Sequence, residues 1–358
     1  MEWLQSQTLL AHRQDDPLTW LIFGVECLSM TMNNSFRFEL PKAPAISGLA
    51  FRHYRGATDL AKIAAVMNAS LAADRNRERI TVEGLAMIYA CPNHRDPQQD
   101  TLFVEVGGTL IGYASKERRE VADGACLHLI HLHLVAEWRG RGLELAMQCH
   151  MERRARVAAA VRSDEACHYF ASKVPETWHA RAEMLLAQGY SPARYFFEMQ
   201  RSLDGDLPVA SPAAGLVFRP ALPEHYRAIW EASVESHRGN WGHIAPSEES
   251  YRAWAETPDL DPGLWRVAWD GKQVAGAAIN VVHKGTWGET DDLFVRHPWR
   301  RRGLGRALLV GSLHLFKARG VTTAGLGVDA ENPSGALRLY ESLGYRPYQC
   351  VAFYRKPM

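Results

Sequence analysis

The chain has 358 residues, with 41 Lys and Arg against 40 Asp and Glu, which gives a formal net charge of +1 when the histidines are neutral. This balance creates no global field that would attract nucleic acid or an anionic membrane, so we expect neither as a partner. The length is enough for two domains of ordinary size, and six cysteines without a CxxC pair are typical of a protein of the reducing cytoplasm.

Residues 1–45 are expected to form a peripheral N-terminal extension. An apolar stretch runs from Pro17 to Met32, but Glu26 interrupts it and two aspartates precede it. It therefore fits neither a membrane-spanning helix nor a signal peptide, which needs a positively charged flank.

Residues 46–203 and 216–358 contain the same series of short motifs, separated by a linker at residues 204–215 that is rich in Pro, Gly, Ser and Asp. An internal repeat of this kind indicates a duplicated domain. Each copy opens with a strand and a helical pattern, followed by a hairpin, GGTLIGYA in the first copy and GKQVAGAA in the second. The other paired motifs are Gly48-Leu-Ala-Phe-Arg52 with Gly215-Leu-Val-Phe-Arg219, Glu137-Trp-Arg-Gly-Arg-Gly142 with Pro298-Trp-Arg-Arg-Arg-Gly303, and Gln188-Gly-Tyr190 with Leu343-Gly-Tyr345.

The first copy contains three closely spaced histidines in the segment LHLIHLHL, which suggest a metal site. Only His131 and His133 share a face of the predicted strand, because side chains alternate along a strand. His128 lies on the other face, and no carboxylate or thiol stands at a ligand spacing nearby. We therefore expect no metal.

The second copy contains the segment VRHPWRRRGLGRALL, residues 295–309, in which an apolar strand leads through a basic, glycine-rich turn into an amphipathic helix. The first N–H groups of a helix lack intrahelical partners and lie at the positive end of the helix dipole. Gly303 and Gly305 have no Cβ, so a pyrophosphate can approach the backbone while the neighbouring arginines supply positive charge. The turn is expected to bind phosphate groups.

A further strand and helix follow this turn. Residues 325–331 are expected to form a buried strand. Asn332 and Pro333 are expected to open the next helix as N-cap and leading proline, and the helix itself is expected at residues 334–343. The helix carries Tyr340 on its apolar face and ends at Gly344. Two terminal strands are expected after it.

Residues 289–354 resemble the acetyl-CoA half of the GNAT superfamily of N-acetyltransferases. RRRGLG, residues 300–305, matches the pyrophosphate signature of that superfamily, and ALRLYESLGY, residues 336–345, matches its next helix. The resemblance implies an α/β fold of two tandem GNAT domains, each a mixed, mostly antiparallel sheet flanked by helices. It also implies an acyltransferase that uses acetyl-CoA as co-substrate.

The resemblance further implies a general base, a general acid and an oxyanion contact in the second copy. Glu289 lies at the spacing of the base in better-studied GNAT enzymes, and Asp291 and Asp292 are alternatives on the same strand. Tyr340 matches the acid that protonates the CoA thiolate, and the backbone N–H of Val295 would polarise the acetyl carbonyl. The alternative for the acids is a solvated strand start, and for the tyrosine a core position. Contacts to acetyl-CoA are expected from Leu293, Phe294, Val295, Arg300, Arg301, Arg302, Gly303, Leu304, Gly305, Arg306 and Asn332.

The two copies differ where the resemblance implies function. The first copy has Glu144 at the position of Gly305 and Leu185 at the position of Tyr340. At an effective dielectric of about 20, two like charges ~4 Å apart repel by about 4 kcal/mol, so Glu144 would keep a diphosphate away. Leu185 has no proton to donate. We expect the first copy to be degenerate and catalytically silent.

The expected function is transfer of acetyl from acetyl-CoA to a primary amine of a small molecule, by direct attack with both substrates bound. The alternative is a non-catalytic acyl-CoA-binding sensor or scaffold with the same fold. Trp241 and Trp254 are candidates for lining the acceptor pocket, with core packing as the alternative for both. The sequence leaves open the acceptor, the acyl-chain preference and the oligomeric state.

Overall fold

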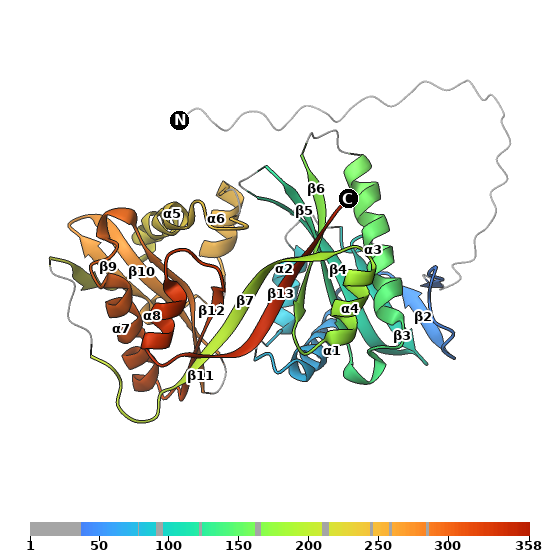
Figure 1. Ribbon diagram of the computed structural model, residues 1–358, viewed down its shortest axis with the longest axis horizontal. Helices are drawn as coiled ribbons and strands as arrows, with labels where there is room; N and C mark the ends of the chain where they lie inside the picture. The colour runs from blue at the N-terminus through green and yellow to red at the C-terminus, as the bar shows by residue number, and fades with distance from the viewer. Residues whose placement is uncertain are drawn as a thin grey trace, which may run out of the picture. The chain divides into compact units, whose positions relative to one another are not determined.

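The computed structural model describes residues 37–77, 79–90, 96–121, 124–161, 166–209, 215–243, 246–257, 260–283 and 286–358 (Figure 1). Within these segments, 13 strands form one continuous sheet. The extension expected at residues 1–45 lies outside the described residues up to residue 36. Its last part differs from the expectation, because Arg37–Phe38 already forms strand β1 against the first copy. In the described segments, no helix is long and apolar enough to cross a membrane.

The first lobe, residues 37–202, consists of strands on which four α-helices pack. Its strands are β1 (Arg37–Phe38), β2 (Leu49–Arg52), β3 (Thr101–Val106), β4 (Thr109–Glu120), β5 (Cys126–Leu134), β6 (His168–Pro175) and β7 (Ser191–Ser202). Its helices are α1 (Leu60–Ala73), α2 (Val82–Ala90), α3 (Leu143–Ala160) and α4 (His179–Ala187).

The second lobe, residues 215–358, repeats this order of elements and confirms the duplication. Both hairpins turn at a glycine with a φ of 57°, Gly107 in the first lobe and Gly271 in the second, a conformation that side chains with a Cβ rarely adopt. The strands are β8 (Val217–Arg219), β9 (Arg266–Asp270), β10 (Gln273–Val282), β11 (Trp287–Val295), β12 (Thr323–Asp329) and β13 (Arg346–Pro357). The helices are α5 (Tyr226–His237), α6 (Glu248–Ala255), α7 (Leu304–Ala318) and α8 (Ala336–Ser342).

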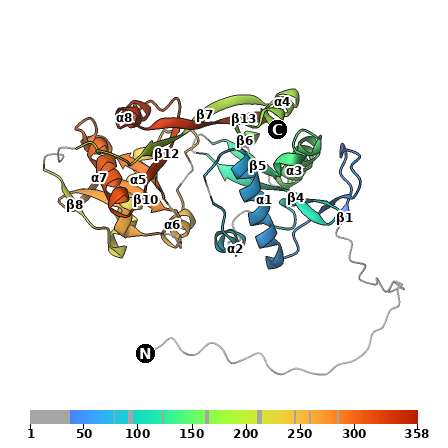
Figure 2. The same cartoon turned by 90° about the horizontal axis from the view of Figure 1, so that it is seen from below.

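The last strand of each lobe pairs with a strand of the other lobe. Residues 196–202 of β7 run antiparallel to residues 323–329 of β12, and residues 351–357 of β13 run antiparallel to residues 169–175 of β6. β7 and β13 also pair with each other and lie side by side (Figures 1 and 2). The expected boundary at residue 203 therefore does not separate two complete sheets. The two terminal strands expected at the end of the chain are one strand, β13, with two register shifts against β7.

Helices cover both faces of the first lobe's sheet (Figure 2). Leu143 and Met147 of α3 are fully buried against Phe170 of β6, while Ile63 of α1 is buried against Phe103 on the opposite face. Each such side chain contributes roughly 1.5–3 kcal/mol when it leaves water. In the second lobe, α7 and α8 share one core and α5 packs in another.

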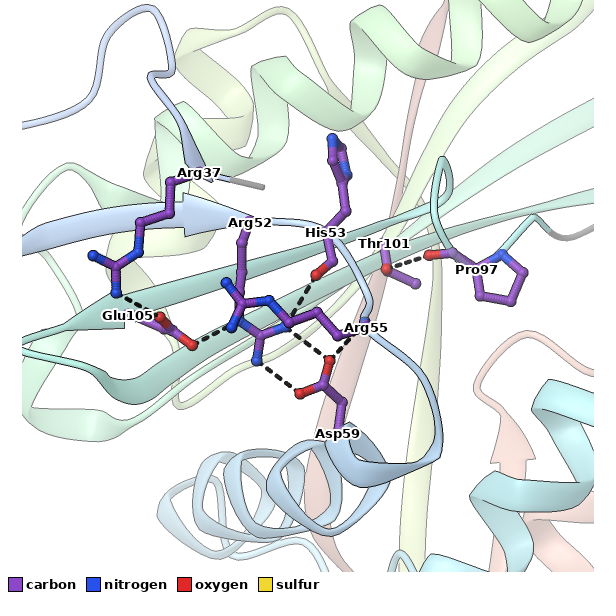
Figure 3. A network of polar contacts seen from close by, with 8 residues as sticks. All are labelled: Arg37, Arg52, His53, Arg55, Asp59, Pro97, Thr101 and Glu105. Carbon is purple, nitrogen blue, oxygen red and sulfur yellow. Dashed lines mark hydrogen bonds and ion pairs between the residues drawn. The ribbon is translucent and has the colours of Figure 1, made fainter. Parts of the chain in front are cut away.

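A buried ion-pair network ties β2 and β3 to the start of α1 (Figure 3). The Arg52 guanidinium donates to both oxygens of Asp59 at 2.8 Å, to Glu105 at 2.6 Å and to the carbonyl of His53 at 3.0 Å. The Arg52 side chain is 1% exposed, and both carboxylates are buried. Because these charges satisfy each other only in one arrangement, the network fixes the first strands of this lobe against its first helix.

Candidate functional site

A cavity of about 1110 Å³ opens where β11 and β12 separate. Their parallel pairing ends at Glu289 and Gly325, and beyond this point the ends of the strands border the cavity together with the first turn of α7 and the start of α8. The first lobe supplies part of the wall. Its lining residues include Ser70, Asp74, Asn76, His131, His133, Lys173, Trp178 and Arg181.

The glycine-rich turn reaches this cavity, and the predicted strand–turn–helix order is confirmed. Gly303 has a φ of 79° and is the N-cap of α7, with no side chain capping the helix. Leu304 is 1% exposed and anchors the first turn in the core. A Cβ on Gly305 would meet Leu339 at 3.5 Å and Val295 at 3.8 Å, which are ordinary contacts. The first turn of α7 therefore presents its backbone to the cavity.

Arg300 differs from the other arginines of the turn. Its Nε donates to the carbonyl of Val295 at 2.9 Å, and its Nη2 donates to the carbonyl of Ser236 at 2.8 Å. Arg139 of the first lobe does the same with the carbonyl of Leu134, at 3.2 Å. The conserved geometry in both lobes indicates that this arginine braces the turn, which the sequence did not suggest. Arg301 and Arg302 are exposed, and Arg306 is half-buried in the first turn of α7.

Two consecutive aspartates of β11 line the cavity because a β-bulge interrupts the alternation of the strand. Asp292 pairs with Ile279 and Thr290 with Asn280, so Asp291 is an extra residue without a counterpart on β10. Such a bulge re-aims side chains at the edge of a site. Asp291 is open to the cavity but otherwise surrounded by protein. Burial and the charges of the neighbouring acids raise the pKa of Asp291 to about 6.

Side chains of α5 hold Asp292. Ser233 Oγ donates to one carboxylate oxygen at 2.6 Å, and His237 Nε2 lies 2.8 Å from the other. Burial lowers the pKa of His237, but the hydrogen bond and the charge of Asp292 outweigh it and raise that pKa above its usual value. Ser233 and His237 thus engage both carboxylate oxygens of Asp292, whereas the raised pKa of Asp291 lets that residue exchange a proton near neutral pH. No motif marks Ser233 or His237 in the sequence, since only the packing of α5 on β11 brings them here.

Tyr340 lines the same cavity from α8 and is 7% exposed. Burial, followed by the charge of Asp292, raises the pKa of Tyr340 to about 12. The phenol therefore keeps its proton at neutral pH. This is the state that a proton donor requires.

Glu289 lies farther back on β11, where the strand still pairs with β12. Its Oε2 is 3.0 Å from Nε2 of His283, and both side chains are about one third exposed. Glu289 is not among the residues that line the cavity, whereas Asp291 and Asp292 are. The structure thus brings two of the three candidate acids together with Tyr340.

The segment after β12 differs from the expectation. α8 begins at Ala336 after Gly335, whose φ is 80°, instead of at residue 334. Asn332 does not cap the helix. Its Oδ1 accepts from the N–H of Ser334 at 2.9 Å and closes a local turn, so the helix starts only after the glycine. Asn332 still lines the cavity.

The two candidate tryptophans have different surroundings. Trp241 lines the cavity and packs edge-on against Phe353, with ring centroids 4.9 Å apart. Trp254 packs against Tyr226 and Trp265 in the core of the second lobe. Trp241 therefore lies at the cavity, where its role toward an acceptor stays a prediction, and core packing is the correct alternative for Trp254.

In the first lobe, two side chains of the protein fill the equivalent site. Glu144 Oε1 accepts from the backbone N–H of Gly140 at 2.6 Å, so a carboxylate occupies the turn that corresponds to the glycine-rich turn before α7. Where β5 and β6 separate, the buried guanidinium of Arg181 donates to the carbonyl of Leu132 at 3.0 Å and to the hydroxyl of Ser172 at 3.0 Å. The aligned QGY and LGY motifs give Arg181 the position of Ala336 in the second lobe.

The histidines of β5 also divide into two groups. His131 and His133 line the cavity, and burial followed by nearby positive charges lowers the pKa of His133 to about 3. His128 lies instead beside Cys126 and His168. The expectation that no thiol stands at a ligand spacing is wrong, because Cys126 precedes His128 by two residues on the same strand face.

Comparison with known proteins adds family relationships to this geometry. Residues 226–345 match the sequence model of the acetyltransferase (GNAT) family. A mycothiol acetyltransferase of Streptomyces scabiei is 28% identical over 261 residues, which cover 71% of this chain and 79% of that protein. A mycothiol acetyltransferase of Kineococcus radiotolerans is 34% identical over 165 residues, 44% of this chain and 52% of that protein.

Two solved structures share the fold. A GCN5-related N-acetyltransferase from Sphaerobacter thermophilus has a TM-score of 0.71 and 24% identity, covering 89% of this chain and 97% of that one. A tandem GNAT protein from the clavulanic acid biosynthesis pathway has a TM-score of 0.62 and 19% identity, covering 86% of this chain and 98% of that one. Residues 226–345 therefore form an acyltransferase domain of the GNAT family, and the chain as a whole has a tandem GNAT fold.

Proposed function

We propose that the second lobe binds acetyl-CoA and transfers its acetyl group to a primary amine of a small molecule. One observation carries this proposal: a single cavity of about 1110 Å³ connects the first turn of α7 with Asp291, Asp292 and Tyr340. A helix N-terminus with two glycines suits a pyrophosphate, and two acids and a phenol suit proton transfer on both sides of a thioester. The domain division at residues 46–203 and 216–358 is part of this proposal.

Binding of the nucleotide part follows from the turn. The N–H groups at the start of α7, with Arg301, Arg302 and Arg306 around them, provide positive potential for the two phosphates. Arg300 contributes by holding the turn to α5. The edge of β11 beyond Glu289 is available to the pantetheine arm, with the N–H of Val295 as the donor to the acetyl carbonyl oxygen.

Asp291 is our preferred general base. An ammonium group must lose a proton before its nitrogen can attack the thioester carbon, and a carboxylate with a pKa of about 6 is largely ionised at neutral pH while still basic enough to accept it. Both carboxylate oxygens of Asp292 are engaged by Ser233 and His237, so we assign Asp292 the role of holding α5 against the site. Glu289, the base implied by the family resemblance, stays a prediction. Because Glu289 does not line the cavity, it would have to take the proton through a water molecule.

Tyr340 is our proposed general acid. When the C–S bond breaks, the electron pair stays on sulfur, and the phenol hydrogen passes to the thiolate. The nitrogen, positively charged after its attack, releases its second proton to solvent as the amide forms, and the tyrosinate takes one proton back, so the net reaction releases the single proton that Asp291 accepted. Its buried position favours the neutral phenol before and after each turnover.

The acceptor is proposed to bind between Asp291 and the wall supplied by the first lobe. Asp74 and Lys173 give this wall charge of both signs and Trp178 gives it flat apolar surface, while Trp241 of the second lobe adds a further apolar ring to the cavity. Such a wall suits a polar small molecule, and the mycothiol acetyltransferase relatives make an acceptor of the mycothiol type the first to test.

The decisive assay measures CoA release from acetyl-CoA across a panel of small-molecule amines, with acetyl-CoA binding measured in parallel by calorimetry. Turnover with an amine at a rate well above hydrolysis supports the proposal. Tight acetyl-CoA binding without turnover on any amine would favour the alternative, a non-catalytic acyl-CoA sensor or scaffold.

A further inference from the structure

Three metal-ligating side chains meet at one edge of the first lobe, away from the cavity. Cys126 and His168 are the first residues of β5 and β6, and the parallel register of these strands sets them opposite each other. His128 follows Cys126 by two residues, so it points to the same face of the sheet. None of the three residues lines the cavity described above.

The ligand atoms have the spacing of a tetrahedral metal site. Cys126 Sγ lies 3.8 Å from Nε2 of His128, which lies 3.0 Å from Nδ1 of His168, and all three ligand atoms lie within 4.8 Å of one another. With Zn–N of about 2.05 Å and Zn–S of about 2.3 Å, tetrahedral geometry requires separations of about 3.3 Å between two nitrogens and about 3.6 Å between nitrogen and sulfur. The two separations that involve His128 therefore lie within a few tenths of an ångström of these values, and the third, between Sγ of Cys126 and Nδ1 of His168, is at most 4.8 Å.

The surroundings suit a borderline-soft cation. Cys126 is 0% and His128 2% exposed, and a thiolate with two neutral imidazoles is a donor set that favours zinc over magnesium or calcium. Arg118 of β4 lies opposite His128 in the sheet, and its charge is paired with Glu120. In a bound state, the negative charge of the Cys126 thiolate would offset one of the two positive charges of the metal ion.

We propose that Cys126, His128 and His168 form a binding site for a Zn²⁺-like ion. The described part of the chain supplies these three protein ligands. Their backbones already hold neighbouring elements: the N–H of Cys126 donates to the carbonyl of Cys167 at 2.9 Å, and the N–H of Met358 donates to the carbonyl of His168 at 3.0 Å. The metal would therefore pin β5 to β6 at the point where the end of β13, the exchanged strand, is attached.

The test uses the intact chain, stripped with a chelator and titrated with Co²⁺ and then Zn²⁺. We expect one equivalent of Co²⁺ to give a thiolate-to-cobalt charge-transfer band and the visible bands of tetrahedral cobalt, which Zn²⁺ abolishes. One equivalent of Zn²⁺ should also raise the midpoint of thermal unfolding, because a ligand that binds only the folded state stabilises it.

Matched variants locate the site. Cys126→Ser should remove the charge-transfer band, and His168→Gln, at a less buried position, should weaken Co²⁺ affinity at least tenfold. Cys167→Ser and His179→Gln change the adjacent exposed thiol and an exposed histidine of α4 that does not line the cavity, and should leave the titration unchanged. Circular dichroism and acetyl-CoA affinity report whether each variant is folded, so a loss of metal binding is separable from misfolding.

Two results would overturn the proposal. One is the absence of saturable one-equivalent binding by the unmodified chain, which would mean that His128 and His168 simply share a hydrogen bond. The other is unchanged affinity and spectrum in both Cys126→Ser and His168→Gln, which would assign any bound metal to other residues.

Discussion

The two lobes contain the same turn before the same helix, and only one of them leaves it open. In the first lobe, Glu144 accepts from a backbone N–H of the turn and Arg181 fills the gap between β5 and β6. In the second lobe, Gly305 and Ala336 occupy these positions, and both line the cavity. Loss of a ligand site in a duplicated domain thus requires no change of fold, since two side chains that satisfy the same backbone groups are enough.

The side chains that fill the equivalent site of the first lobe also support the wall of the cavity in the second lobe. Arg181 donates to β5, whose residues His131 and His133 form part of the cavity wall, and Trp178 lies between Arg181 and Arg139, 5.1 and 3.8 Å from their guanidinium carbons. Burial as the main cause lowers the pKa of Arg181 to about 10, yet the group stays protonated at neutral pH. The lobe whose own site is filled by side chains therefore forms part of the wall of the cavity in the other lobe.

The largest expected effect comes from making the second turn resemble the first. Gly305→Glu brings a carboxylate to where the phosphates are proposed to bind, and a repulsion of about 4 kcal/mol corresponds to roughly 10³-fold weaker acetyl-CoA affinity, measured by calorimetry. Gly305→Ala is the control, because it adds a Cβ that meets only ordinary contacts within the protein, so the difference in affinity between the two variants isolates the charge. Equal affinity of the glutamate variant and the unmodified protein would remove our explanation of the silent lobe.

A second comparison concerns the arginine that ends the first strand of each repeat. Arg52→Ala leaves the buried carboxylates of Asp59 and Glu105 without a counter-charge and should lower the free energy of unfolding by about 3–5 kcal/mol in urea titrations. Arg219 is exposed, with its guanidinium carbon 4.8 Å from the ring centroid of Trp269, so Arg219→Ala should cost about 0.5–1 kcal/mol. If both substitutions lowered the free energy of unfolding by similar amounts, the burial of Arg52 would not account for the difference predicted here.

Tyr340→Phe tests the residue that replaces Leu185 of the silent lobe. Without the phenol proton, kcat should fall by about 10²-fold while acetyl-CoA affinity changes little. Tyr345→Phe alters a second buried tyrosine that does not line the cavity and is the matched control. A normal kcat in Tyr340→Phe would leave the thiolate to be protonated by another group.

The pH dependence separates the candidate bases. If Asp291 is the base, kcat/KM should rise with pH through about 6, and Asp291→Asn should abolish that limb. Because the charge of Glu289 helps to raise the pKa of Asp291, Glu289→Gln should move the limb to lower pH without abolishing it. The opposite pattern, with the limb lost only in Glu289→Gln, would make Glu289 the base.

The same residue links activity to stability. The pKa of Asp291 rises from 3.8 to about 6 on folding, so its protonated form favours the folded state. That stabilisation is complete below pH 3.8 and is lost as the pH rises through about 6. Asp291→Asn should therefore raise the midpoint of thermal unfolding at pH 7, an effect that circular dichroism measures.

The sequence was sufficient for features carried by local spacing. The glycine turn before α7, the hairpins at Gly107 and Gly271 and the position of Tyr340 on the apolar face of α8 all follow from periodicity and backbone requirements. The duplication followed from repeated short motifs for the same reason.

Features that depend on which strands pair with each other, and in which register, could not be predicted from the sequence. The exchange of β7 and β13 involves partners more than a hundred residues away, and no local pattern marks it. The bulge at Asp291 arises from the register of β10 against β11, which alternation alone cannot give. Likewise, His168 meets Cys126 only through the parallel pairing of β5 and β6.

The most direct test of the central claim is a crystal structure of the chain grown with CoA. We predict one CoA per chain, with its phosphates at the N-terminus of α7 near Gly303 and Gly305 and its sulfur near Tyr340. The turn before α3, where Glu144 is bound to Gly140, should contain none. CoA at that first turn, or at neither turn under saturating conditions, would contradict the account.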